Sequence, residues 1–142
     1  MRFAKSHNPT EAELRAWAAE AGAAEPEGDW DLVLSWGMEP GRLRVLVELA
    51  ADPTLPNAPY FLITLYTWVS YVARRDDFDS WRPQYDRWLD AAKGVRDPAV
   101  KRWRHSARRI FQGLDPFDAD AWGAGMVADT GGSSPDAASD SP

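Results

Sequence analysis

The spacing of apolar residues predicts helices wherever the chain shows a regular pattern. Residues 9–21, 40–51, 81–92 and 98–112 carry apolar side chains every three or four positions, which is typical of amphipathic helices. Glycine or proline stands near the ends of these stretches, where these residues begin or end helices. We therefore expect an all-α fold, a compact bundle or short stack of about five to six helices.

The first of these helices has a clear start signal. Asn8 can cap it, and Pro9 suits the first helical position because its missing N–H costs nothing there. Glu11 follows three residues after the cap and can reach back to it. Gly22 ends the pattern. The expected buried stripe consists of Leu14, Trp17, Ala18 and Ala21.

Residues 59–75 differ from the other helices because they are apolar on almost every side. Such a helix belongs at the centre of a bundle or in a bilayer. The uninterrupted stretch, residues 60–73, is shorter than the roughly 20 residues that a bilayer requires, and Thr64, Thr67 and Ser70 dilute it. We expect this segment to be the central core helix.

Residues 29–36 fit two patterns. Trp30 and Trp36, with two leucines between them, alternate as in a strand, whereas Trp30, Val33 and Gly37 fit a helix with a glycine cap. No second strand candidate exists, and an isolated strand cannot satisfy its backbone groups. A helix is therefore the favoured interpretation.

The C-terminal part divides into two. Residues 115–128 are expected to form one short turn that docks Phe117 and Trp122 onto the bundle. Residues 129–142 contain no large apolar side chain and cannot offset their ordering entropy. The predicted organisation is a single α-helical domain over residues 1–128 and a disordered acidic tail over residues 129–142.

One stretch resembles a known repeat. Leu89 to Ile110, LDAAKGVRDPAVKRWRHSARRI, resembles a helical hairpin of the HEAT type, in which Asp-Pro begins the second helix and a Val-Lys step follows. The resemblance covers about 22 of the 142 residues. It implies a stacked helical-hairpin scaffold that binds partners without catalysing a reaction. The matching positions are Asp97, Pro98, Val100, Lys101 and Arg102.

Charge is distributed unevenly along the chain. Residues 58–113 carry 11 basic and 6 acidic side chains, whereas residues 1–57 carry 5 and 10 and residues 114–142 carry 0 and 6. The absence of cysteine excludes disulfides, zinc–thiolate sites and thiol nucleophiles. The first twenty residues contain no apolar segment typical of a secretory signal, so we expect a cytoplasmic protein.

The basic residues gather on one face of the helix predicted over residues 98–112. Lys101, Arg104, His105 and Arg108 follow helical spacing and could meet phosphates or an acidic protein. The plainer alternative is a solvated face, paired with Asp86 or Asp90 of the preceding helix or with the acidic tail. No aromatic residue interrupts this face for base stacking, which disfavours single-stranded nucleic acid.

The eight tryptophans divide into two groups. Five lie on apolar stripes and are expected in the core: Trp17, Trp68, Trp81, Trp88 and Trp103. Trp30, Trp36 and Trp122 lie in weaker elements. There, a partly exposed tryptophan could anchor a partner, although isolated exposed apolar residues are also common.

Catalytic and metal-binding patterns are weak. The two histidines, His7 and His105, lack a serine or carboxylate at diagnostic spacing. The acidic run at residues 76–79 is better explained as a helix-capping turn than as a cation site. Residues 118–129 superficially follow a calcium loop, but Trp122 stands at a ligand position. We predict no catalytic residue, cofactor or metal ligand.

Three functions remain open. The favoured one is a non-enzymatic protein–protein interaction module, such as a bacterial immunity or antitoxin-like protein, with another protein as its partner. A nucleic-acid-associated regulator that uses the basic helix 98–112 is the first alternative, and an enzyme without a recognisable motif is the second. No membrane partner is expected.

Overall fold

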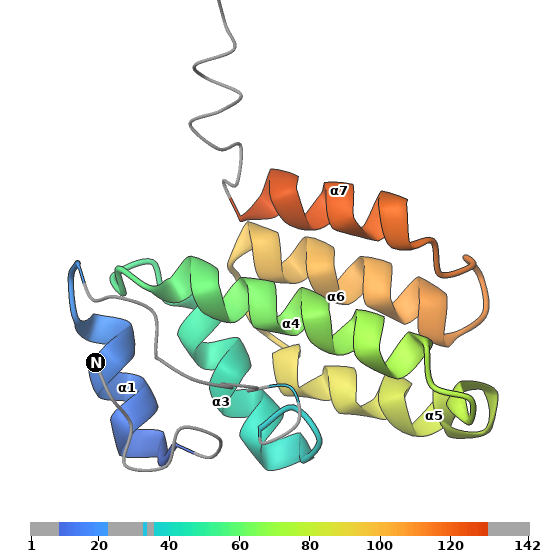
Figure 1. Cartoon of the computed structure of the whole chain (residues 1–142), viewed down its shortest axis with the longest axis horizontal. Coiled ribbons are helices and arrows are strands. Elements are labelled where there is room, and N and C mark those ends of the chain that lie inside the picture. The colour runs from blue at the N-terminus through green and yellow to red at the C-terminus, as the bar shows by residue number, and fades with distance from the viewer. Residues whose placement is uncertain (1–8, 23–32, 34–35, 131–142) are drawn as a thin grey trace, which may run out of the picture.

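A computed structural model describes residues 9–22, 33 and 36–130, and this part of the chain is all-α (Figure 1). The predicted fold class is confirmed. The predicted tail from residue 131 onward lies outside the described residues, as does the segment 29–36 apart from Val33 and Trp36. The helices are α1 (Glu11–Ala19), α3 (Pro40–Ala51), α4 (Ala58–Ala73), α5 (Phe78–Trp88), the short 3-10 helix η1 (Leu89–Ala92), α6 (Pro98–Phe111) and α7 (Ala119–Asp129).

Helix α4 is the centre of the fold, as its all-round apolar sequence predicted. It packs against α3, α6 and α7, and Figure 1 shows α5, α6 and α7 running back and forth beside it. Its 16 residues include many buried apolar side chains. Among the described residues, no helix is long and apolar enough to span a membrane.

An aromatic cluster around Trp68 joins α4 to α5 and α6. The Trp68 ring lies 6.1 Å from the rings of Tyr85 and Trp88, 6.3 Å from Trp103 and 5.7 Å from Phe111, measured between centroids. Aromatic pairs at such separations contribute beyond their buried area. The expected core positions of Trp17, Trp68 and Trp103 are therefore confirmed.

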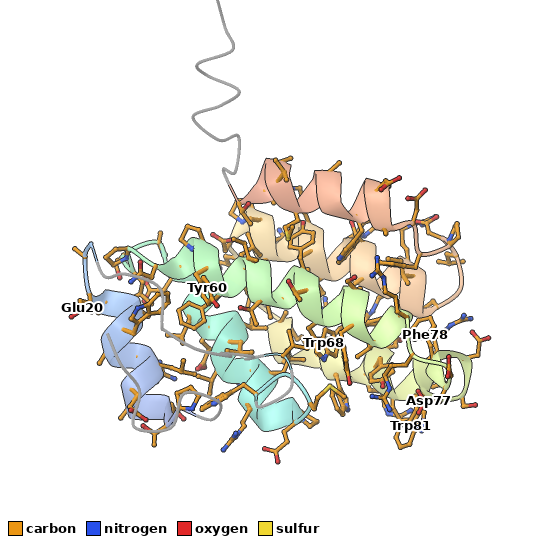
Figure 2. The ribbon with its side chains drawn as sticks, in the orientation of Figure 1. Glu20, Tyr60, Trp68, Asp77, Phe78 and Trp81 are labelled. Carbon is orange, nitrogen blue, oxygen red and sulfur yellow. The ribbon has the colours of Figure 1, made fainter. Side chains whose placement is uncertain are left out.

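Three residues that the sequence places on apolar stripes are exposed instead: Ala21 after the first helix, Trp81, and Leu114, expected to end the stripe of the helix predicted over residues 98–112. Ala21 lies beyond α1, which ends at Ala19. Trp81 is 47% exposed and Leu114 is 60% exposed. In α5 the buried positions are Phe78 and Tyr85, followed by Leu89 in η1, so Trp81 lies outside the narrow face that meets the cluster. In Figure 2 the Trp81 side chain points away from the helices. Leu114 lies beyond Gly113, where α6 has already ended.

The helix ends follow local capping chemistry. The start of α1 was predicted two residues too early: the Thr10 hydroxyl, not Asn8, accepts from the Glu13 N–H at 3.1 Å. The Glu13 carboxylate accepts from the Thr10 N–H at 2.9 Å, which completes a capping box. The predicted start of α6 is confirmed, because the Asp97 carboxylate accepts from the Val100 N–H at 3.0 Å.

The segment after α6 is more ordered than the predicted single turn. It forms the 11-residue helix α7, which Asp118 caps by accepting from two N–H groups in its first turn. Phe117 and Trp122 pack against the core as expected. Helix α7 ends at Asp129, one residue beyond the predicted boundary at residue 128.

Candidate functional site

Trp36, predicted as a partner anchor, is a core residue. It is 3% exposed, and its indole N–H donates to the Pro9 carbonyl at 2.9 Å. The Arg42 guanidinium lies 4.6 Å from the centre of its ring. Trp36 therefore fixes the start of α1 near α3 and leaves no surface for a partner. The other predicted anchor in this segment, Trp30, lies outside the described residues.

The four basic residues predicted on α6 lie together on one groove. We call it the basic groove; it has a volume of about 540 Å³ and runs between α6 and the connection from η1 to α6. Sequence reasoning missed Arg96, which also lines it, because this residue lies in a connection that has no helical period. The complete lining is Ala92, Gly94, Val95, Arg96, Lys101, Arg104, His105 and Arg108.

Two of the arginines are held in place by α5 and η1. The Arg104 Nε donates to the Leu89 carbonyl at 3.0 Å, and the Arg108 Nε lies 3.3 Å from the Asp86 carboxylate. The Asp90 carboxylate lies 3.6 Å from the Arg104 guanidinium and 3.5 Å from that of Arg108. The pairing with Asp86 and Asp90 considered from the sequence is present, and it gives both guanidinium groups a fixed orientation.

The remaining cations of the basic groove are not paired in this way. Lys101, His105 and Arg96 are exposed, and within the described part of the chain none of them has a hydrogen bond or ion pair. The charge of His105 acts on Asp115 at a distance and contributes to the lowered pKa of that carboxyl, after the larger effect of Arg109. The groove therefore offers free positive charge to solvent.

The opposite edge of α6 carries an ion pair with the last residue of α7. The Arg102 Nε lies 2.7 Å from the Asp129 carboxylate, which also accepts a short hydrogen bond from the Tyr66 hydroxyl. The Trp122 indole N–H donates to the Tyr66 carbonyl at 2.8 Å. Trp122, the third predicted anchor, is therefore half-buried and engaged within the domain.

The acidic residues of the weak metal patterns have other roles. Asp77 stands at the start of α5 but pairs with Arg75 at 3.0 Å, and this guanidinium lowers the pKa of the Asp77 carboxyl. Asp118, the first position of the superficial calcium loop, caps α7. Among the described residues, no group of three or more histidine, aspartate or glutamate side chains could hold a metal ion.

The basic groove is suited to binding anions. Its lining holds basic side chains, two of them fixed by ion pairs, over small apolar residues. Comparison with protein-family models, curated proteins and solved structures finds no match for this chain. Fold and site together define, over the described residues, an all-α domain that carries a basic groove.

Proposed function

We propose that this chain is a non-enzymatic protein-binding domain whose basic groove takes an acidic segment of a partner protein. The observation that carries the proposal is the combination of two held arginines, Arg104 and Arg108, with the unpaired Lys101 and Arg96 in one open groove. Guanidinium groups that are already oriented lose less entropy when they bind a carboxylate.

The dimensions of the basic groove suit an extended peptide. Lys101 and Arg108 are seven residues apart on α6, a distance of about 10 Å along a helix at about 1.5 Å per residue. An extended segment covers that length with about three residues, at about 3.3 Å per residue. Because Ala92 and Gly94 are small, a peptide backbone can lie close to the groove floor.

The same cations could bind the phosphates of a nucleic acid, but one feature favours a protein. No aromatic side chain lines the groove, so bases have no surface on which to stack. A nucleic-acid-associated regulator is therefore the second candidate.

The wider setting of this activity is part of the proposal. A stacked helical-hairpin scaffold, as the resemblance of residues 89–110 to HEAT repeats implies, would present α6 and its groove to a partner. A bacterial immunity or antitoxin-like protein acting in the cytoplasm is one role for such a domain. A pull-down from the native host tests this role, and it fails if no stoichiometric protein partner is recovered.

The binding surface is tested by titration with a defined probe. A short fluorescein-labelled peptide of alternating glutamate and alanine should bind at low salt, whereas its glutamine counterpart should not. Lys101→Glu should weaken binding about tenfold, because one attraction is replaced by a repulsion. The control is Arg44→Glu, which makes the same charge change at an exposed position of α3.

Three results would contradict the proposal. The first is no binding of the peptide at low salt. The second is equal weakening by the two charge reversals, which would indicate only a general charge effect. Tighter binding of a labelled single-stranded DNA than of the peptide would favour the nucleic-acid alternative, provided that the affinity falls steeply with salt.

A further inference from the structure

Asp90 lies beside the basic groove and pairs with two of the arginines that line it. Its carboxylate lies between the guanidinium groups of Arg104 and Arg108, at 3.6 and 3.5 Å, and the side chain is 62% exposed. Asp86 contacts Arg108 more closely, at 3.3 Å, is only 24% exposed and also accepts from Gln112. Of these two carboxylates, Asp90 is therefore the one that solvent can readily replace.

The two arginines do not depend on Asp90 for their positions. The Arg104 Nε remains bonded to the Leu89 carbonyl, and the Arg108 Nε remains beside Asp86. If Asp90 moved away, both guanidinium groups would keep their orientation and would expose N–H donors to the groove. Exposed ion pairs contribute little to stability, so the movement would require little free energy.

We infer that Asp90 is an internal competitor, which occupies in the free domain the place that a partner's carboxylate takes in the complex. This inference rests on the proposed function. Incoming carboxylates replace Asp90 at Arg104 and Arg108 while further acidic residues meet Lys101 and Arg96. A ligand with one carboxylate only exchanges one ion pair for another, so Asp90 selects segments that carry several closely spaced acidic residues.

The variant Asp90→Asn tests this role, because asparagine keeps the size of the side chain and removes its charge. The peptide of alternating glutamate and alanine should bind up to about fivefold more tightly, a factor that corresponds to one exposed ion pair. The matched control is Asp79→Asn, whose 87% exposed carboxylate pairs with Arg82 on α5. It changes the net charge equally and should leave the affinity unchanged.

A double variant separates competition from a general gain of positive charge. Arg104→Ala should weaken binding, and Asp90→Asn should give a much smaller gain in the Arg104→Ala background than in the unmodified protein. A thermal melt of each variant establishes that it is folded.

The possible failures can be told apart. If the unmodified domain does not bind the peptide, the proposed function and this inference both fall. A second outcome is that the unmodified domain binds the peptide and Lys101→Glu weakens binding, but Asp90→Asn and Asp79→Asn bind it with the same affinity. In that case only the competitor role is refuted. If Asp90→Asn weakens binding, Asp90 positions the arginines and the inference is wrong.

Discussion

The two edges of α6 carry similar positive charges but differ in how these charges are paired. On the edge that faces α7, Arg102 pairs with Asp129 and Arg109 pairs with Asp115, both at 2.7 Å. On the edge that forms the basic groove, Lys101 is exposed and has no such partner among the described residues. A basic residue that the rest of the chain leaves unpaired, such as Lys101, adds free charge to the arginines that are held in the basic groove.

One residue of α4, Tyr66, makes two hydrogen bonds to α7. The Tyr66 carbonyl accepts from Trp122, and the Tyr66 hydroxyl donates to Asp129, so both side-chain anchors of α7 meet at this residue. Helix α7 itself buries no residue fully. Its docking therefore depends on these polar contacts and on the partly buried Trp122 and Met126, whereas the groove edge rests on the core beneath α6.

The largest loss of stability is expected from a substitution in the core beneath α6, on which both edges of this helix rest. Trp103 is fully buried beneath α6, and Trp103→Ala should lower the free energy of unfolding by about 3–5 kcal/mol through lost packing. Urea denaturation measures this loss. The control Trp81→Ala truncates a half-exposed indole and should cost far less. Equal losses would mean that the aromatic cluster does not support α6 as described.

A smaller loss of stability is expected from a substitution that affects the contact with α7 and leaves the basic groove unchanged. Tyr66→Phe removes the hydroxyl that binds Asp129 and should cost about 1–2 kcal/mol, because the bond involves a charged acceptor. Hydrogen exchange of the α7 amides should be faster in this variant. Its affinity for the peptide of alternating glutamate and alanine should equal that of the unmodified protein. Tyr71→Phe, which removes an exposed hydroxyl beside Arg75, is the control. Similar behaviour of the two variants would refute the role of Tyr66.

Alkaline pH should remove the stabilisation that the hydrogen bond between Tyr66 and Asp129 provides. Burial first, and then the hydrogen bond to Asp129, raise the pKa of Tyr66 above its ordinary value of about 10. Its stabilisation is therefore complete below about pH 10 and is lost as the pH rises through the folded-state pKa. Unfolding free energies measured against pH should fall above about pH 10, less steeply for Tyr66→Phe. Burial also raises the pKa of Tyr85, and this contribution remains in both proteins. Equal slopes would contradict the assignment.

The smallest expected effect is a gain in the stability of α7. A Cβ added at Gly123 meets nothing within 4 Å, and one added at Gly125 lies 4.0 Å from the Tyr66 ring. Each change to alanine should therefore stabilise α7 by up to about 1 kcal/mol, through helix propensity. Slower exchange of the α7 amides measures the gain. Gly113→Ala is the opposite control, because Gly113 has a φ of 75° and should lose stability. A loss at Gly123 would mean that its packing is tighter than described.

The sequence predicts the elements whose signals are local. Helix α3 has the predicted bounds, Pro40 and Ala51, because proline marks its start and Asp52-Pro53 its end. Helix α7 could not be predicted in full, since its two internal glycines disfavour a helix and its anchor, Tyr66, lies far away in the sequence. Long-range contacts decide such segments.

The same limit applies to the candidate site. Helical spacing brings Lys101, Arg104, His105 and Arg108 together on one groove, as expected from α6 alone. The contribution of Arg96 does not follow from a periodic pattern, because this residue lies in a connection that only tertiary packing places beside α6. The pairing with Asp86 or Asp90 is one of the interpretations that the sequence allows, but the bridging of Arg104 and Arg108 by one carboxylate is not. The burial of Trp36 depends likewise on the Pro9 carbonyl, 27 residues away.

The central claim, that the groove edge of α6 is the binding surface and the α7 edge is not, is tested most directly by NMR. The isotope-labelled protein is titrated with the peptide of alternating glutamate and alanine, and the amide shifts are followed residue by residue. The account predicts saturable changes at Val95, Arg96, Lys101 and Arg104, with Ala121 and Trp122 of α7 unaffected. Changes centred on α7, or none that saturate, would contradict it.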